Sequence, residues 1–305
     1  MAIPTALAGM TVDPLVHEID ERWLMAYAAG LGLDDPCYLD TTRAGGIVAH
    51  PLFPVCIEWP AIVASRARSE EVGVDPAEVV TSVHATHDVT LHRPIRPGDR
   101  LTTTLEVVGV VARSPGALSH TRLRTVDDHG RPVATTTQAG IYLGVGTEGP
   151  DHPDPAPPGP VAGMDRRGEP TETAVPVSAV AAHVYTECAR IWNPIHTDPV
   201  VARAAGLPAI ILHGTANLAH GVDAVVAGPA GGAPERVRRI VGRFSAMVLL
   251  PSTLTVRVWP ANPVAGDDGG PGTLVVPFEV GNGEGAVAVS DGAVVLDDTR
   301  AYASQ

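Results

Sequence analysis

Residues 185–215, YTECARIWNPIHTDPVVARAAGLPAIILHGT, carry the most informative pattern in this chain. Asp198 directly precedes Pro199, which predicts the start of a short helix, because aspartate caps helix N-termini and proline fits the first helical position. Gly214 then opens residues 214–226, which are largely apolar and predict a buried helix. The pattern therefore describes two helix starts joined by a loop that contains histidines.

The clearest change in composition lies at residues 146–170, which hold seven prolines, five glycines and almost no large apolar side chain. Such a segment buries too little surface to offset the entropy of ordering it, and proline keeps it extended. We therefore predict an N-terminal repeat over residues 1–145, a linker over residues 146–170 and a C-terminal repeat over residues 171–305. Each repeat is long enough to fold around a core of its own.

Both halves show helical spacing first and strand spacing afterwards. In the first half, apolar residues recur at helical spacing over residues 12–33, a second apolar segment covers residues 55–67, and the period changes to two after Val79. In the second half, three helices are predicted before the strands, over residues 178–190, 199–205 and 214–226. One apolar helix wrapped by an antiparallel sheet would bury both elements, so the predicted class is α+β with the same arrangement in each half.

The charged residues exclude several kinds of chemistry. The 305 residues carry a formal net charge of −13, and all 21 basic residues are arginine. Without lysine there can be no Schiff-base catalysis, no lysine-bound pyridoxal phosphate, no biotinyl or lipoyl carrier site and no P-loop. The arginines form no long basic block, so the chain lacks the electrostatic footprint of a nucleic-acid-binding protein.

Cysteine usage and hydropathy predict a soluble, cytoplasmic protein. Cys37, Cys56 and Cys188 are odd in number and widely spaced, which fits reduced thiols and gives no support to a metal cluster. The N-terminal residues lack the charged and apolar segments of a secretion signal, and no run approaches the roughly 18 apolar residues of a membrane span. We therefore expect no membrane partner and no metal.

Residues 185–215 resemble the signature of the MaoC-like, or type 2 (R-specific) enoyl-CoA hydratase, family of hot-dog proteins. The residues that match it in order and spacing are Asn193-Pro194-Ile195-His196, Asp198-Pro199, Ala202 and Ile210-Ile211-Leu212-His213-Gly214. The first half is similar to the motif-poor N-terminal repeat of that family. The resemblance implies a tandem, or double, hot-dog fold in which each half is an antiparallel sheet wrapped around an apolar helix.

The resemblance also implies an activity, the reversible addition of water to a trans-2-enoyl thioester. His196 would be the general base or acid, Asn193 would orient the turn that presents it, and the Gly214 N–H would donate a hydrogen bond to the developing oxyanion. Gly214 also suits this role on physical grounds, because it has no Cβ to block the thioester carbonyl. No metal or redox cofactor is implied.

The sequence departs from the family at the catalytic Asp, because Ile191 stands at that position and Arg190 precedes it in place of glycine. Three interpretations stay open. Glu187 could supply the missing carboxylate, since residues four apart share a helix face. Arg190 could hold a substrate carboxylate beside His196 in a bidentate manner, or could simply pair with Glu187. Hydration could also be lost, leaving a thioester-binding protein or one that adds a substrate hydroxyl to the enoyl group of the same molecule.

Other side chains near the motif have both a functional and a structural interpretation. Tyr185 and Trp192 could line the acyl pocket or could serve as ordinary aromatic packing. His213 is predicted to be a core histidine, because it lies between Leu212 and the apolar helix. Three further histidines lie on one predicted strand, at positions 84, 87 and 92. No fourth ligand or carboxylate accompanies them at metal-binding spacing, so we predict that they are solvated.

The expected partners follow from the thioester carrier, which would be CoA or an acyl carrier protein. The chain would form a homodimer or a pseudo-dimeric monomer. If CoA is the carrier, arginines and backbone N–H groups must bind its phosphates, because no lysine is available. The arginines that we expect to lie outside the core and to be available for this role are Arg236, Arg238, Arg239 and Arg243.

Overall fold

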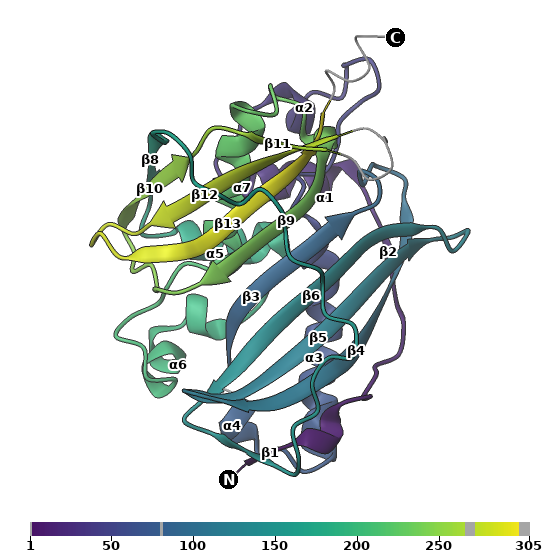
Figure 1. Ribbon diagram of the computed structural model, residues 1–305, viewed down its shortest axis with the longest axis vertical. Helices are drawn as coiled ribbons and strands as arrows, with labels where there is room; N and C mark the ends of the chain where they lie inside the picture. Colours follow the sequence, from purple (N-terminus) through teal and green to yellow (C-terminus); the bar gives the residue numbers. More distant parts are fainter. Residues whose placement is uncertain (1, 80–81, 266–271, 299–305) are drawn as a thin grey trace.

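One curved antiparallel sheet organises the chain (Figure 1). The computed structural model describes residues 2–79, 82–265 and 272–298. Within these ranges the sheet has 11 strands, in the order β2-β4-β5-β6-β3-β9-β13-β12-β10-β8, with β11 paired to β12. The strands are β2 (Leu15–Glu18), β3 (Ser82–Leu91), β4 (Arg100–Arg113), β5 (Gly116–Asp127), β6 (Pro132–Leu143), β8 (Thr171–Val177), β9 (Val237–Phe244), β10 (Ser252–Val258), β11 (Asn262–Val264), β12 (Thr273–Gly281) and β13 (Val287–Asp297).

The two halves of the chain build the two halves of this sheet with the same topology. In the first half the order is β2-β4-β5-β6-β3, and in the second it is β8-β10-β12-β13-β9. The halves meet where β3 pairs antiparallel with β9, from Thr86 opposite Arg243 to Thr90 opposite Arg239. Equivalent strands thus lie side by side in opposite directions, which is the arrangement that a pseudo-twofold axis produces.

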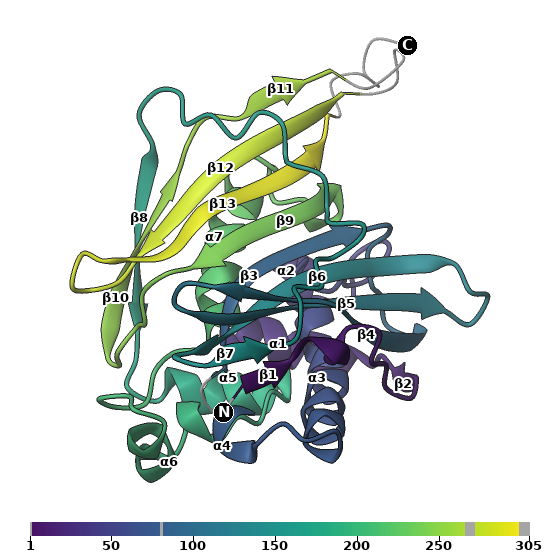
Figure 2. The same ribbon diagram turned by 60° about the horizontal axis from the view of Figure 1, so that its bottom comes forward.

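The helices gather on one face of the sheet (Figure 2). In the second half α7 packs against β9, β10, β12 and β13, and in the first half α3 packs against β2 and β4. The helices are α1 (Glu21–Gly30), α2 (Pro36–Leu39), α3 (Pro54–Glu71), α4 (Pro76–Val79), α5 (Ala181–Ala189), α6 (Pro199–Ala204) and α7 (Gly214–Ala227). The described part of the chain also contains three 3-10 turns, η1 (Thr5–Leu7), η2 (Pro194–His196) and η3 (Pro234–Arg236), and a small parallel pair, β1 (Ala2–Pro4) with β7 (Gly146–Glu148).

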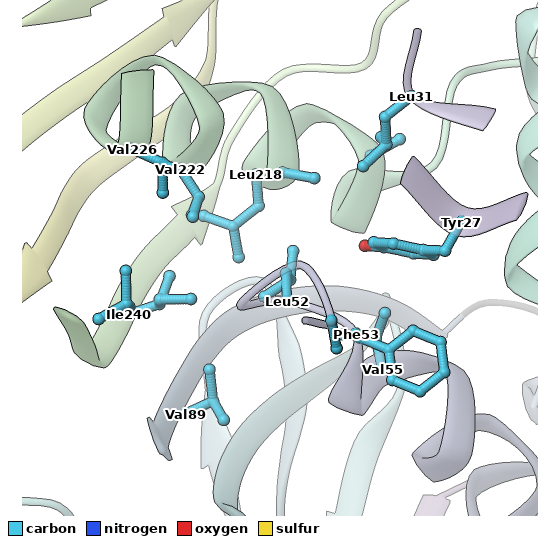
Figure 3. Packing of buried hydrophobic residues seen from close by; sticks show 14 of the residues in the cluster. Tyr27, Leu31, Leu52, Phe53, Val55, Val89, Leu218, Val222, Val226 and Ile240 are labelled. Atoms are coloured by element: carbon cyan, nitrogen blue, oxygen red, sulfur yellow. The ribbon is translucent and has the colours of Figure 1, made fainter. Parts of the chain in front are cut away.

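A hydrophobic core joins the two halves (Figure 3). Leu52 and Phe53, just before α3, belong to the same buried cluster as Leu218 of α7. Val89 of β3 and Ile240 of β9 are paired across the boundary of the two half-sheets and are also part of it. Burial of apolar surface at about 25 cal/mol per Å² therefore stabilises the contact between the halves as well as each half. The prediction of a tandem hot-dog fold, with a sheet wrapped around an apolar helix in each half, is confirmed.

The predicted helix over residues 12–33 is shorter than expected. Its first part is strand β2, and helix α1 begins only at Glu21, where the Asp20 carboxylate accepts a hydrogen bond of 2.6 Å from the Trp23 N–H. Residues 15–18 alternate between half-buried and exposed, which is the period of a strand. Strand β8 has the equivalent position in the second half and was also missing from the predicted elements.

Residues 146–170 pass over the face of the sheet that lies opposite the helices (Figure 1). The segment is held there by polar contacts. Asp154 accepts a hydrogen bond of 2.7 Å from Arg122 of β5, and the Gly159 carbonyl accepts one of 2.7 Å from Arg239 of β9. The predicted division into repeats on either side of this segment stays a prediction, but the segment itself is fixed to both half-sheets.

Candidate active site

The loop after α5 places His196. Helix α5 ends at Ala189 because Arg190 adopts a left-handed backbone conformation, with φ of 57°. The chain then turns through Asn193 into η2, where the His196 N–H donates to the Asn193 carbonyl over 3.1 Å. His196 is only 8% exposed. The Asn-Pro-Ile-His sequence thus forms a tight turn that directs an imidazole into the protein interior.

Two contacts fix the His196 ring. Its Nδ1 lies 2.9 Å from the Ile211 carbonyl, and its plane stacks on that of His213 with centroids 3.7 Å apart. A carbonyl can only accept a hydrogen bond, so Nδ1 carries the proton in neutral imidazole and Nε2 keeps the lone pair. A general base accepts a proton through a lone pair, and this tautomer provides that lone pair on Nε2.

His213 is the more deeply buried ring of the stacked pair. It is buried, as predicted, and its Nε2 lies 3.1 Å from the Thr186 hydroxyl. Burial, together with the nearby His196 imidazole, lowers the pKa of His213 well below its ordinary value. Burial also lowers the pKa of His196 to about 4, against a smaller opposing effect of the bond to Ile211. Both rings are therefore neutral near pH 7.

Gly214 follows His213 directly and is the first residue of α7. Its N–H belongs to the first turn of the helix, whose amide groups have no acceptor within the helix and carry the positive end of the helix dipole. A Cβ on this residue would lie 3.1 Å from the Phe244 ring. A glycine here leaves room for a carbonyl oxygen beside a free backbone donor, and Phe244 closes one side of that space.

Tyr185 is 1% exposed and supports the site from behind. Its hydroxyl donates to the Thr215 hydroxyl over 3.0 Å and lies 3.4 Å from the Tyr27 hydroxyl of the first half. Its ring lies 4.9 Å from the His213 ring. The structure therefore places Tyr185 behind His213, in the core where α1 meets α5.

Glu187 was expected to supply the carboxylate that the resemblance implies at position 191. The Ile191 side chain is buried, and because α5 ends before it, Glu187 and Ile191 do not share a helix face. The Glu187 carboxylate is exposed and accepts a hydrogen bond of 3.3 Å from the Trp192 indole. The expectation of a carboxylate beside His196 rested on a continuous helix, which the left-handed Arg190 interrupts.

Arg190 does not pair with Glu187 either. Its guanidinium lies over the Trp23 ring, 3.9 Å from the centroid, at the edge of a cavity of about 310 Å³. Arg190 and Trp192 line this cavity from the second half, while Trp23 and Cys56 line it from the first. Both residues therefore lie at a junction between the halves.

The histidines of β3 were predicted to be solvated, which is wrong for two of them. His87 is 1% exposed, and the Nε2 atom of His84 is buried. A bulge between His84 and Thr86 lets both rings face inward, where their centroids are 5.4 Å apart. Only His92 is exposed, bonded to Thr135. Within the described residues, no three His, Cys, Asp or Glu side chains are placed to hold a metal ion.

Sequence reasoning missed Phe244, His84 and Arg66 as residues that border or influence the motif. The His84 ring lies 4.6 Å from the Phe244 ring, which in turn borders Gly214. The charge of Arg66 on α3 adds to burial in lowering the pKa of both His84 and His196. His84 and Phe244 come from β3 and β9, and the pairing of these two strands brings them together.

The arginines proposed for CoA phosphates are mostly occupied. Arg236 donates to two backbone carbonyls, Arg238 pairs with Asp297 and Arg239 pairs with Asp88. Arg243 is exposed, with no acceptor among the described residues. A search of the described helices for a stretch long and apolar enough to cross a bilayer finds none.

Comparison with known proteins agrees with this geometry. Residues 165–274 match the family described as MaoC like domain, and residues 6–136 match the FAS1-like dehydratase domain region. The 3-hydroxyacyl-thioester dehydratase Y of Mycobacterium tuberculosis is 27% identical over 98% of this chain and 97% of its own. A MaoC-like dehydratase structure from Phytophthora capsici superposes with a TM-score of 0.78 at 24% identity, covering 96% of this chain and 97% of that one.

A second structure shows the fold alone. The Mycobacterium tuberculosis protein Rv0216, described as having a double hotdog fold, superposes with a TM-score of 0.62 at 18% identity, covering 95% of this chain and 96% of its own. Fold and site together define a double hot-dog protein with its motif in the second half. More particularly, residues 165–274 are a MaoC-like domain and residues 6–136 are a FAS1-like dehydratase domain region.

Proposed function

We propose that the protein catalyses the reversible addition of water to a 2-enoyl thioester, with His196 as the group that moves the proton. The observation that carries this proposal is the geometry of the His196 imidazole. The Ile211 carbonyl holds this ring as the tautomer with a free Nε2, and the ring stacks on His213, the residue directly before the first residue of α7. A base and an oxyanion donor are the two groups that addition to an enoyl thioester needs.

The reaction balances with one imidazole. Nε2 of His196 takes a proton from water while the water oxygen bonds to C3, and the C2–C3 electron pair moves toward the thioester oxygen. The Gly214 N–H donates a hydrogen bond to that oxygen as its charge grows. The proton on Nε2 then passes to C2, which restores the carbonyl and the neutral imidazole. Dehydration is the same path in reverse.

The remaining motif residues have supporting roles in this proposal. Asn193 shapes the turn that presents His196, and Tyr185 positions His213 behind it. Arg190 and Trp192 contact the substrate where they line the cavity between the halves. The carrier is CoA or an acyl carrier protein. The reaction needs no electron transfer, so we expect no redox cofactor. The imidazole and the backbone N–H supply the base and the oxyanion donor, so we expect no metal. We expect the cytoplasm as its location and either a homodimer or a pseudo-dimeric monomer as its state.

The first test is the loss of enoyl absorbance when purified protein meets 2-enoyl-CoA thioesters of several chain lengths, in wild type and in His196→Gln. Removing a general base lowers kcat by about 10²- to 10⁴-fold, so we expect a loss of that size. Glu187→Gln is the matched control, and we expect less than about a threefold change because the Glu187 carboxylate binds Trp192. Full activity in His196→Gln would remove the proposed mechanism.

A second function is favoured by one observation, the buried isoleucine at position 191, where the resemblance implies an acidic residue. In this alternative the protein binds acyl thioesters without hydrating them, or adds a substrate hydroxyl to the enoyl group of the same molecule. Calorimetric binding of a saturated acyl-CoA, with no turnover of any enoyl-CoA, would support binding alone. Turnover limited to enoyl thioesters that carry a hydroxyl would support the intramolecular addition.

A further inference from the structure

Two inward-facing histidines of β3 have buried ring nitrogens without a hydrogen-bonding partner. His87 is 1% exposed, and neither its Nδ1 nor its Nε2 is bonded. The Nε2 atom of His84 is buried in the same condition, and the centroids of the two rings lie 5.4 Å apart. Buried polar atoms in proteins are nearly always bonded. The pair therefore calls for a polar group from outside the chain.

Other buried histidines of the protein each have a bond to one ring nitrogen. The His50 Nδ1 accepts a hydrogen bond of 3.1 Å from the Leu52 N–H, and the His213 Nε2 lies 3.1 Å from the Thr186 hydroxyl. Among the described residues His87 is the one side chain with two buried, unpaired nitrogens. A ring that lacks both bonds contributes little to holding the fold together, because a buried polar group without partners is unfavourable.

A row of ring contacts connects this pair to the proposed oxyanion donor. The His84 ring lies 4.6 Å from the Phe244 ring of β9. Phe244 in turn lies 3.1 Å from the point that a Cβ on Gly214 would occupy. Gly214 directly follows the ring that stacks on His196. One aromatic ring therefore separates the unpaired nitrogens of β3 from the place where the thioester carbonyl is proposed to bind.

The bonding capacity of the pair defines the group that it would bind. Burial lowers the pKa of His84 to about 4 and that of His87 well below its ordinary value, so both rings are neutral near pH 7. A neutral imidazole has one N–H donor and one acceptor nitrogen, and in His87 both are unpaired. A carboxylate only accepts hydrogen bonds and an ammonium only donates them, whereas a hydroxyl does both. The pair is thus complementary to an uncharged hydroxyl.

We infer that His84 and His87 bind a hydroxyl group on the acyl chain of the substrate, farther from the thioester than the carbons on which His196 acts. This inference rests on the proposed function and narrows its substrates to 2-enoyl thioesters with a hydroxylated chain. Phe244 contacts the apolar part of the chain between the thioester and that hydroxyl. The two histidines determine specificity and take no part in the proton transfer.

A hydroxyl of the acyl chain fits this place better than the hydroxyl of the carrier arm. In the pantetheine arm of CoA or of a carrier protein, two amide groups separate the hydroxyl from the thioester sulfur. Between Gly214 and His84 there is only the Phe244 ring, which is too short a path for that arm. Water has the same bonding capacity as a hydroxyl, and substrates with and without a hydroxyl on the acyl chain distinguish the two.

The test compares pairs of 2-enoyl-CoA substrates of equal chain length, one with a terminal methyl group and one with a terminal hydroxyl, over several lengths. At the best length we expect kcat/KM of wild type for the hydroxyl substrate to exceed that for the methyl substrate by at least about tenfold. His87→Phe should reduce this ratio by about 10- to 100-fold, because its ring cannot bond the hydroxyl. His92→Phe is the matched control, since His92 lies directly after β3, is exposed and is bonded to Thr135.

Two outcomes would overturn the inference. One is an equal loss on both substrates in His87→Phe, which would assign the histidines to the carrier arm or to the fold. The other is a wild type without preference for the hydroxyl at any length, which would leave a bound water as the only partner of the two rings. Circular dichroism and thermal unfolding show whether each variant is folded. His87→Gln keeps a donor and an acceptor and should retain part of the preference.

A binding measurement separates this inference from the proposed function. Saturated acyl-CoA thioesters without a 3-hydroxyl can be neither hydrated nor dehydrated, so their calorimetric affinities do not depend on catalysis. We expect wild type to prefer the ligand with a terminal hydroxyl over its methyl-ended counterpart by about tenfold, and His87→Phe to lose that preference. A preference without any hydration would contradict only the proposed function, whereas hydration without the preference would contradict only the role of His84 and His87.

Discussion

The His196 side chain shows how one residue can be prepared for proton transfer without a carboxylate beside it. In many acid–base sites a carboxylate fixes the histidine tautomer and also raises the pKa of the ring. Here the Ile211 carbonyl fixes the tautomer, and burial against neutral His213 keeps the ring uncharged. His196 is therefore available as a base over the whole neutral range.

This arrangement predicts a flat pH profile. His196 acts as a base in its neutral form, and its pKa of about 4 means that it is neutral at every pH above about 5. We expect kcat/KM for hydration to be constant within about twofold from pH 5.5 to 8. Steady-state rates across this range check it. A fall in kcat/KM on acidification with a midpoint near pH 6.5 would instead indicate an exposed, unperturbed histidine.

Gly214→Ala tests the oxyanion donor. The new Cβ would lie 3.1 Å from Phe244 and close to the space assigned to the thioester oxygen, so we expect kcat to fall by about 10²-fold or more while the protein stays folded. Adding Phe244→Leu relieves the contact with the ring but not the block at the helix N-terminus. Recovery of kcat in the double variant would show that crowding against Phe244, not the loss of the donor site, caused the defect.

At this scale the sequence predicts part of the site. His196 and Gly214 could be located because the residues that place them, from Asn193 to Gly214, are contiguous in the chain. His84 and Phe244 could not, since they lie on different strands and meet only through the pairing of β3 with β9. Glu187 was misplaced by a single backbone angle, the positive φ of Arg190, which helical spacing does not reveal.

Helix α7 contains a glycine at a position where the packing requires one, although glycine has a low helix propensity. Gly221 lies in its buried face, and a Cβ there would overlap the Phe278 ring of β12. Alanine is favoured over glycine in a helix by about 1 kcal/mol, but overpacking of a core costs about 1–3 kcal/mol. Helix and sheet approach closely at this point, so the steric effect should be the larger one.

We therefore expect Gly221→Ala to lower the free energy of unfolding by about 1–2 kcal/mol, measured by urea denaturation. The double variant with Phe278→Leu supplies the control in a double-mutant cycle. A favourable coupling between the two substitutions would locate the cost in their contact. Stabilisation by Gly221→Ala alone would show that the helix can move away from the sheet.

The order of elements was more predictable than their ends. Strands β4, β5 and β6 follow turn signals, and α7 begins at the predicted glycine. Strands β2 and β8 were missed because each is short and lies beside a helix whose apolar spacing dominates a longer window. The bulge in β3 was also unpredictable, and it alone turns His84 inward beside His87.

For the whole molecule, the buried titratable groups predict a loss of stability in acid. Burial lowers the pKa of four histidines to about 3 or 4, which are His50, His84, His196 and His220. In the unfolded chain each would bind a proton near pH 6.5. The contribution of these histidines to the free energy of unfolding is thus complete above about pH 6.5. It is lost as the pH falls toward 4, because the unfolded state then binds more protons than the folded state.

Two buried carboxyl groups act in the opposite direction. Burial raises the pKa of Glu58 and Asp223 to about 7. Their contribution to the free energy of unfolding is therefore present in acid and is lost as the pH rises through 7. Four histidines outnumber two carboxyl groups, and we expect the urea midpoint to be lower at pH 5 than at pH 7.5. Glu58→Gln should raise the midpoint at pH 8 and leave it unchanged at pH 5. A midpoint that rises on acidification would show that the carboxyl groups dominate.

The antiparallel pairing of β3 with β9 makes one polypeptide out of what could have been two identical subunits, and this has a genetic consequence. In a symmetric dimer every codon change appears twice, so an arginine gained in one copy is imposed on its mate. In this chain Trp23, which lines the cavity between the halves, belongs to the first half and His196 to the second, and each could change without altering its counterpart. Fusion of the halves therefore lets the first half change in sequence while the motif of the second half is kept.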